Sequence, residues 1–547
     1  MGPYDARLPI FSSKEQKCSS DVMKAARLLI ECLEAEGVSR IFGIPGEENL
    51  DIMDEISSSK IEFVLTRHEQ AAAFMAGTVG RLTGRPGVCL STLGPGATNL
   101  VTGVADAFLS NLPLIALVGQ AGIVRRHPPQ KQVLDLMTMF RPLTKMCIDV
   151  DRPDRTASAV REAFILAKAE RSGPVMLQLP EDVMKMSVDD IPVAEENHPS
   201  QPGELSALDK IRTALRSSSN PLVIVGHGAV RSNAVEEVRA FCRTWNLPTA
   251  CTWMAAGVMP YDDPLSMGTI GIRNSDLVKD CFEPADLVLL VGYDATEFQP
   301  QYWNKGRKKT LLVLGEGGPG EAENFQIDIM ALGDLKGSLS MLQGGSVPKS
   351  NWAGSVRLKL QRETEVLEQG PKGMVQSIRR QLGRRDILVS DVGAHLIWLA
   401  KYYPTYEENT LLLQNGLISM GVAIPSAIAA RMIHPERKVV AAVGDGGFLM
   451  SSAELETAKR LGVNFVTVIF NDGGLGLIRE KMERGFGRSS NVDMGFPDIP
   501  TYARSFGAEG YSVGGKDFED VLQDCLERDV LAVIDVKVDY SHNCRLF

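Results

Sequence analysis

The chain has 547 residues, of which 44% are hydrophobic and 23% charged, so it is long enough for three or four globular domains and is neither disordered nor fibrous. Acidic residues outnumber basic residues by 68 to 58, a net charge of −10, and without a long basic block we expect no nucleic-acid partner. The chain has no apolar run of about 18 residues, no secretory signal pattern and no C-x-x-C pair among its nine cysteines, so we expect a cytoplasmic protein with reduced thiols and no membrane contact.

Residues 1–18 are polar and irregular, and we expect them to form an N-terminal arm. The unit over 19–190 alternates short apolar runs with helical stretches. One helix is expected from the Ser-Ser-Asp cap at 19–21 to Gly37, and further helical stretches at 68–83 and 97–110. The expected strands are 40–45, 61–66, 87–92, 112–119 and 175–179. Short strands that alternate with helices predict a parallel sheet with helices on both faces.

Two breaks divide the rest of the chain. Prolines and polar residues at 191–204 predict a linker before a second unit, 203–343, and a Gly- and Ser-rich stretch at 344–355 precedes a third, 356–547. The strands expected in the second unit are 221–225, 247–252, 285–292 and 310–315. Those expected in the third unit are 386–391, 410–414, 438–443, 464–470 and 532–538. The sequence therefore predicts an α/β fold of three doubly wound domains with mainly parallel sheets.

Two acidic turns of the third unit carry the strongest chemical signal. Asp445 follows one apolar run in a Gly-Asp-Gly-Gly turn, and Asp472 follows the next run about 27 residues later. Because neighbouring parallel strands end at one edge of a sheet, the two carboxylates are expected to share one hard cation. The glycines let backbone N–H groups approach a phosphate. A GDGG turn alone is more often only a tight turn, but the second acid favours a metal and diphosphate site.

These motifs resemble those of thiamine diphosphate (ThDP) enzymes, in which GDG is followed by a strand-terminal Asn or Asp. The strings FGIPGEENLD at 42–51, TRHEQ at 66–70 and LGPGATN at 93–99 resemble the pyrimidine-binding domain of acetolactate synthases. The resemblance extends from about residue 20 to 540, in the order of the family. It implies a ThDP-binding fold in which 19–190 binds the pyrimidine, 203–343 is the central domain and 356–547 binds the diphosphate.

The resemblance implies a role for each motif residue. Glu69 hydrogen-bonds the aminopyrimidine and so activates the carbon nucleophile of the cofactor. Asp445, Asp472 and the Gly474 carbonyl bind Mg²⁺, and Met420 wedges the cofactor into its bent form while its N–H and the Ile418 carbonyl contact the pyrimidine. The other cofactor-binding residues expected from the resemblance are Gly393, Ala394, His395, Gly444, Gly446 and Gly447. Without the resemblance, Glu69 is equally well a solvated loop acid, and Met420 is more often core filler.

Substrate contacts are expected near the end of the first unit. The spacing of Gln132 to the sequence PLTK at 142–145 resembles that of a family glutamine that points at the substrate, although a lone Gln in a polar loop is usually solvated. The nearby charges of Arg125, Arg126, His127 and Lys131 attract a keto-acid carboxylate or form an ordinary solvated cluster.

The resemblance implies a carboligase that decarboxylates a 2-keto acid, pyruvate first, and adds the product to a second 2-keto acid to give 2-acetolactate. GYDATEF at 292–298 and QYWN at 301–304 resemble the catabolic acetolactate synthases, so we expect no FAD, and Gly226-His227-Gly228 is too short for a dinucleotide site. Two departures leave the acceptor pocket open: GEGGPGEAENF follows the strand 310–315, and LGLIREK stands at 475–481 where the biosynthetic branch has a Trp.

Three alternatives remain at the level of sequence. The first is a carboligase for larger or aromatic 2-keto acids in secondary metabolism. The second is a simple 2-keto acid decarboxylase, against which the lack of an adjacent His pair counts. The third is a non-catalytic homologue that acts as a binding subunit, against which the intact Glu69, Asp445 and Asp472 count. The family also implies a homo-oligomer, at least a dimer, with the active site at the subunit interface.

Overall fold

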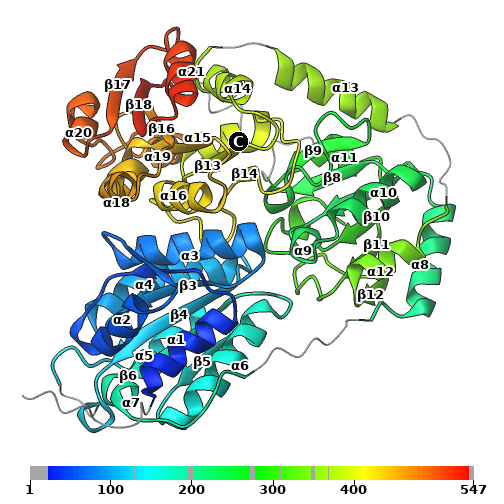
Figure 1. Ribbon diagram of the computed structural model, residues 1–547. Helices are drawn as coiled ribbons and strands as arrows, with labels where there is room; N and C mark the ends of the chain where they lie inside the picture. The colour runs from blue at the N-terminus through cyan, green and yellow to red at the C-terminus, as the bar shows by residue number, and fades with distance from the viewer. Residues whose placement is uncertain are drawn as a thin grey trace, which may run out of the picture.

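The computed structural model of the protein describes residues 23–126, 130–193, 201–271, 278–306, 309–345, 352–366 and 369–540. They form three α/β domains, coloured blue to cyan, green, and yellow to red along the chain (Figure 1). The expected N-terminal arm and the cap at 19–21 lie outside the described residues. Within the described ranges, no helix combines the length and the apolar character that crossing a membrane would require.

The N-terminal domain is built on a six-stranded parallel sheet with the strand order β2-β1-β3-β4-β6-β5. The inner strands β3, β4 and β6 are buried along their whole length, because helices cover both faces of the sheet. The strands are β1 (Arg40–Gly43), β2 (Glu62–Leu65), β3 (Gly87–Ser91), β4 (Leu114–Gln120), β5 (Met146–Asp149) and β6 (Pro174–Pro180). The helices are α1 (Ala25–Ala35), α2 (Leu50–Ser57), α3 (Glu69–Thr83), α4 (Pro95–Leu109), α5 (Leu136–Phe140), α6 (Thr156–Lys168) and α7 (Glu181–Lys185).

The central domain has a different six-stranded parallel sheet, with the order β12-β11-β10-β7-β8-β9. This is the order of dinucleotide-binding folds, with the topological switch point between β7 and β10. The strands are β7 (Pro221–Val225), β8 (Thr249–Thr252), β9 (Ser266–Ile270), β10 (Leu287–Val291), β11 (Thr310–Gly315) and β12 (Ile329–Leu332). The helices are α8 (Leu205–Ser217), α9 (Gly228–Arg231), α10 (Val235–Trp245), α11 (Val278–Phe282), α12 (Leu335–Met341) and α13 (Trp352–Glu365), the last of which packs on β9.

The C-terminal domain repeats the strand order of the N-terminal domain, β14-β13-β15-β16-β18-β17, and its switch point lies between β13 and β15. The strands are β13 (Ile387–Ser390), β14 (Leu411–Leu412), β15 (Val439–Gly444), β16 (Val466–Asn471), β17 (Glu509–Val513) and β18 (Ala532–Lys537). The helices are α14 (Pro371–Gln381), α15 (Ala394–Tyr402), α16 (Ala423–Ile433), α17 (Asp445–Ser451), α18 (Glu454–Leu461), α19 (Gly476–Phe486), α20 (Ile499–Ser505) and α21 (Phe518–Arg528).

The fold class predicted from the sequence is confirmed. Every predicted strand is present, with bounds that differ by at most two residues. The structure adds four strands that the sequence did not predict: β5, β9, β12 and β17. Each of the four forms an edge of its sheet.

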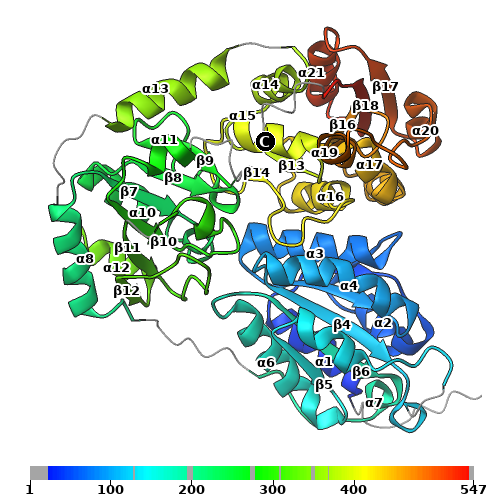
Figure 2. The same ribbon diagram turned by 180° about the vertical axis from the view of Figure 1, so that it is seen from behind.

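An apolar contact joins the N-terminal and C-terminal domains within the chain. Helix α3 lies against α16 in both views (Figures 1 and 2), and the two domains share one continuous core. Polar bonds also cross this contact, among them one from the Thr78 hydroxyl to Ser426 Oγ at 2.8 Å and one from Arg81 Nη1 to the Leu413 carbonyl at 2.9 Å. The second half of α3 is thereby fixed relative to the C-terminal domain.

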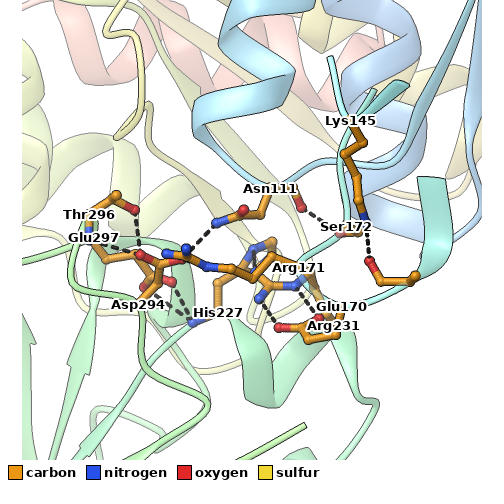
Figure 3. Close-up of polar contacts among 11 residues, drawn as sticks. Asn111, Lys145, Glu170, Arg171, Ser172, His227, Arg231, Asp294, Thr296 and Glu297 are labelled. Carbon is orange, nitrogen blue, oxygen red and sulfur yellow. Dashed lines mark hydrogen bonds and ion pairs between the residues drawn. The ribbon is translucent and has the colours of Figure 1, made fainter. Parts of the chain in front are cut away.

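The central domain contacts the N-terminal domain through charged side chains (Figure 3). Asp294, just after β10, accepts hydrogen bonds from Arg171 and from Asn111 Nδ2, the latter at 3.0 Å. Arg231 of α9 forms an ion pair with Glu170. Because these partners come from both domains, they orient the central domain next to the pyrimidine-binding region expected from the sequence.

Candidate active site

The two predicted metal ligands follow adjacent parallel strands. Gly444 at the end of β15 pairs in register with Phe470 of β16. Asp445 and Asp472 therefore follow the carboxyl ends of two neighbouring strands, on the same side of the domain. Asp445 is 2% exposed, and its two oxygens accept backbone N–H groups, Oδ1 from Gly446 at 2.8 Å and Oδ2 from Gly474 at 2.7 Å. The side chain of Asp445 is therefore fastened to the loop that carries Asp472.

The fold holds the two carboxylates close enough to influence each other. Burial and the charge of Asp445 raise the pKa of Asp472 to about 6, and Arg479 opposes this increase. Burial also raises the pKa of Asp445, while its backbone N–H bonds lower it. Burial and mutual repulsion make the charged forms of both carboxylates unfavourable. A hard divalent cation bound between them would neutralise their charges.

A pocket of about 130 Å³ opens at this edge, at the switch point between β13 and β15. Every residue that lines it belongs to the C-terminal domain. The lining includes all the predicted cofactor-binding residues except Ile418, namely Gly393, Ala394, His395, Met420, Gly444, Asp445, Gly446, Gly447, Asp472 and Gly474.

The His395 imidazole forms one wall of the pocket near the start of α15. The residue is 1% exposed, and its ring stacks on Phe470 with centroids 5.6 Å apart. Burial lowers the pKa of His395 to about 4, so the ring is neutral at neutral pH. Its Nε2 has no hydrogen-bond partner among the described residues. A Cβ at Gly393 would lie 3.0 Å from this ring, which explains why glycine precedes the helix.

A buried carboxylate shapes the segment that contains Met420. Asp391 accepts hydrogen bonds from the N–H groups of Gly421 and Ala423, each at 3.0 Å, and so fixes the turn that leads into α16. Ile418, two residues before Met420, has φ +58°, a strained conformation for a β-branched residue, and its side chain is 45% exposed. The predicted pyrimidine contacts thus lie on a segment held in one conformation.

Glu69 lies in the N-terminal domain, at the first residue of α3. It is 6% exposed, and its Oε2 accepts a hydrogen bond from Asn99 Nδ2 at 2.9 Å. The other oxygen lies beside Gly96, where a Cβ would be 3.3 Å from Oε1. The solvated-loop alternative is therefore wrong for Glu69, because its carboxylate is enclosed by the TRHEQ and LGPGATN motifs.

Gln132 lies close to the same motifs. The Gln132 carbonyl oxygen would be 2.9 Å from a Cβ at Gly94. Like Ile418, Gln132 has a left-handed backbone conformation, with φ +65°. Two of the charges expected at the mouth are already paired, Arg125 with Glu181 at 2.6 Å and Arg126 with Asp149 at 2.5 Å, whereas Lys131 is exposed. His127 lies outside the described residues.

The predicted residues therefore form two groups within one chain. The first group, with Glu69 and Gln132, lies on the N-terminal domain. The second, with Asp445, Asp472 and Met420, lines the pocket of the C-terminal domain, and Glu69 does not line that pocket.

Sequence reasoning did not assign the carboxylate of Asp391 to the 421–423 turn, nor did it find Arg479 or Tyr540. Tyr540 lines the pocket, and burial together with the charges of Asp472 and Asp445 raises the pKa of its phenol well above the usual value. A signal was available for Tyr540, since it follows β18, the strand next to β16. Arg479 offers none, because a single Arg on an exposed helix is ordinary.

The three-domain fold with a carboxylate pair at the edge of its third sheet defines the class of thiamine diphosphate enzymes, and comparison with known families agrees. The family models of thiamine pyrophosphate enzymes match the N-terminal TPP binding domain at 23–139, the central domain at 208–342 and the C-terminal TPP binding domain at 391–536. Thiamine pyrophosphate and thiamine diphosphate are the same cofactor.

Relatives of known name match the chain along nearly its whole length. The acetolactate synthase of Bacillus subtilis is 34% identical over 98% of this chain and 96% of its own length. The catabolic acetolactate synthase of Raoultella terrigena is 32% identical over 95% of both chains. A probable acetolactate synthase large subunit of Methanocaldococcus jannaschii is 30% identical over 94% of this chain and 92% of its own. The chain belongs to the acetolactate synthase family of thiamine diphosphate enzymes.

Proposed function

We propose that this protein decarboxylates a 2-keto acid and joins the remaining fragment to a second 2-keto acid, with pyruvate in both roles and 2-acetolactate as the product. The observation that carries the proposal is the convergence of Asp445, Asp472 and His395 on one pocket at the switch point of the third sheet. The similarity to named acetolactate synthases over nearly the whole chain supports the same reaction.

The chemistry of the pocket fits a diphosphate held through Mg²⁺. Asp445 and Asp472 supply two carboxylate ligands, and the Gly474 carbonyl is the third ligand that we propose. The neutral His395 presents a nitrogen without a protein partner, and Gly393 and Gly444 lie against its ring. Bound ThDP supplies the carbon nucleophile and the electron sink of the reaction.

The residues of the N-terminal domain have a separate task. Glu69, enclosed and hydrogen-bonded by Asn99, is the residue that we propose would exchange a proton with the aminopyrimidine of bound ThDP. Gln132 lies on a neighbouring loop of the same edge and is the residue that we propose for substrate orientation. Met420, which precedes the turn held by Asp391, is the residue that we propose would support the cofactor when it is bound.

A complete site needs both groups of residues, and we propose that it forms between two copies of the chain. The C-terminal pocket contains no residue of the N-terminal domain, and Glu69 does not reach it within one chain. Leu417 and Ile418, just before the pocket-lining Met420, and Leu449 and Met450, just after the pocket-lining Gly447, are exposed apolar side chains. A partner that brings its own Glu69 to this pocket would cover them. The proposed assembly is therefore at least a homodimer.

We propose that the protein binds no flavin. At the switch point of the central sheet, where dinucleotide folds bind their ligand, several of the protein's own polar groups bond to each other (Figure 3), although a cavity of about 500 Å³ opens beside His227 and Arg231. The Glu297 carboxylate accepts a hydrogen bond from the His227 N–H at 3.0 Å and another from the Thr252 hydroxyl, and Asp294 is paired with Arg171. A visible absorbance spectrum of the purified protein tests this point, because a bound flavin gives a characteristic yellow absorbance.

Product analysis tests the reaction itself. The protein is incubated with ThDP and Mg²⁺ and with pyruvate, a longer aliphatic or an aromatic 2-keto acid, alone and in pairs, and the products are identified by mass spectrometry. We expect 2-acetolactate from pyruvate alone. Acetaldehyde as the main product would replace the proposal with a simple decarboxylase, and turnover only with larger keto acids would replace it with a different carboligase.

A further inference from the structure

The guanidinium of Arg479 holds the turn that carries Asp472. Arg479 lies on α19, and its Nη1 donates to Asp472 Oδ2 at 3.0 Å and to the Asp472 carbonyl at 3.4 Å. Its Nη2 donates to the Gly473 carbonyl at 3.4 Å and to Asp493 Oδ1 at 3.0 Å. The side chain is 24% exposed. One planar group therefore fixes both the backbone and the carboxylate of this turn.

Two glycines make room for this arrangement. A Cβ at Gly474 would lie 2.2 Å from the Val492 carbonyl oxygen and 2.6 Å from Arg479 Nη2, and a Cβ at Gly476 would lie 2.0 Å from Asp472 Oδ2. These distances are shorter than side-chain carbons tolerate, so a larger residue at 474 would collide with the Val492 backbone and the guanidinium, and one at 476 would displace the carboxylate. The local sequence thus accommodates the Arg479–Asp472 contact as well as an approaching phosphate.

The contacts distinguish the two oxygens of Asp472. Oδ2 is bound by Arg479, whereas none of the hydrogen bonds from other residues in the described ranges engages Oδ1. Asp445, the other proposed ligand, is oriented by the N–H groups of Gly446 and Gly474. Each carboxylate of the pair is therefore fixed by its own donor, and each retains lone pairs for a cation.

We propose that Arg479 is a positioning residue for the divalent cation: it orients Asp472 so that Oδ1 binds the metal while Oδ2 remains on the guanidinium. The inference rests on the proposed function, since it assumes that Asp472 is a metal ligand. Groups that orient metal ligands through their second oxygen or nitrogen typically change metal affinity by about 10- to 100-fold when they are removed.

The opposite role makes the opposite prediction. If Arg479 were a substitute cation that occupies the metal position, the metal would have to displace it, and removal of Arg479 would strengthen metal binding. If Arg479 orients Asp472, removal weakens metal binding, because the carboxylate is then free to rotate. The sign of the change in affinity separates the two roles.

Arg479→Met is the test, because Met keeps the length of the side chain and removes the charge and the donors. Mn²⁺ serves as the probe, since it shares the preference for oxygen ligands and its electron paramagnetic resonance signal reports the free ion. With saturating ThDP, we expect the Kd for Mn²⁺ to rise about 10- to 100-fold in Arg479→Met. Arg479→Lys keeps the charge but not the planar guanidinium, so we expect this variant to bind Mn²⁺ almost as weakly as Arg479→Met does.

Arg484→Met is the matched control. Arg484 lies on the same helix and pairs with Glu480, so its substitution changes the net charge equally without contact to Asp472. We expect an unchanged Kd for this variant. Unchanged or tighter Mn²⁺ binding by Arg479→Met, or full recovery in Arg479→Lys, would overturn the positioning role. Wild-type protein that binds no Mn²⁺ with ThDP present would instead overturn the metal site itself, and thermal unfolding without metal shows whether each variant is folded.

Discussion

Asp106 on α4 is a residue whose charge the fold leaves poorly compensated. Its carboxylate is buried beside the Arg81 guanidinium, and Oδ1 has no hydrogen-bond partner among the described residues. Burial raises the pKa of Asp106 to about 7, and Arg81 only partly offsets the increase. The native state therefore binds a proton more tightly than the unfolded chain. As the pH rises from about 4 to about 7, this carboxyl makes the protein progressively less stable.

Replacement of Asp106 by Asn removes that dependence. At about pH 8 we expect Asp106→Asn to be more stable than wild type by about 1–4 kcal/mol, because each unit of raised pKa corresponds to about 1.4 kcal/mol. At about pH 4 the difference should be small, since wild-type Asp106 is then protonated in the native state. Unfolding midpoints at several pH values and one protein concentration measure the effect. Parallel pH profiles for the two proteins would contradict the assignment.

Glu69→Gln removes the proposed proton exchange with the aminopyrimidine and keeps the size of the side chain. We expect kcat to fall by about 10²- to 10⁴-fold and exchange of the reactive cofactor proton to slow in parallel, while ThDP still binds. Glu48→Gln is the matched control, because Glu48 is also buried in this domain and accepts a hydrogen bond from the Thr92 hydroxyl at 2.7 Å. Near wild-type turnover in Glu69→Gln would remove Glu69 from the mechanism.

At the scale of secondary structure, the sequence predicted the inner strands and missed four of the edge strands. β7 and β11 are almost continuous apolar runs because helices cover both faces, and their bounds were predicted without error. β17 is half exposed along its length, and β12 has only one fully buried residue, so neither shows an apolar run. Edge strands pair on one side only, so a sequence pattern based on burial finds some of them, here β2 and β14, and misses the others.

The site was predictable to a similar extent and for a related reason. Asp445 and Asp472 follow inner strands, so the position of each was fixed by a strong apolar run. The roles of Asp391 and Arg479 depend on which loop lies opposite each side chain. The partner of Asp391 is about 30 residues away in the sequence, and no local pattern records that contact.

Glu454, at the start of α18, connects an element of the C-terminal domain to the loop before Glu69. Its Oε1 accepts the N–H groups of Arg67 at 2.8 Å and His68 at 3.2 Å, and the side chain is fully enclosed. In Glu454→Ala both N–H groups lose their partner inside the protein. We expect a loss of stability of about 2–4 kcal/mol and a lower kcat, because the loop that positions Glu69 is released.

Unfolding midpoints and kcat measure this effect, and Glu456→Ala is the control on the same helix. Glu456 makes exposed ion pairs with Arg460 and Arg67, and such pairs contribute only about 0–1 kcal/mol. Glu454→Gln retains the acceptor oxygen and should keep most of the stability. An equal loss of stability in Glu454→Ala and Glu456→Ala would show that the two hydrogen bonds accepted by Glu454 contribute no more than an exposed ion pair.

For the whole molecule, the repeated strand order gives a simple view of the site. The N-terminal and C-terminal domains have the same topology, and each places its candidate site residues near the carboxyl ends of its strands. Within one chain the domains meet through α3 and α16, away from the pocket lining. A second copy related by twofold symmetry can bring the part of its N-terminal domain that carries Glu69 to this pocket. By symmetry, the pocket of the second copy then receives Glu69 of the first.

Subunit complementation tests that arrangement directly. Chains with Glu69→Gln and chains with Asp445→Ala should each be inactive alone, the second because it no longer binds Mg²⁺ and ThDP. In a mixed dimer, one site combines the intact Glu69 of one chain with the intact Asp445 of the other, while the second site has both defects. Random mixing of equal amounts should restore about a quarter of the wild-type activity, since half the dimers are mixed and half of their sites are intact. If each site forms within a single chain, every site carries one defect and the mixture stays inactive. Co-expression of the two chains with different affinity tags, followed by purification on both tags, gives the mixed dimer alone, whose activity should then be about half that of wild type.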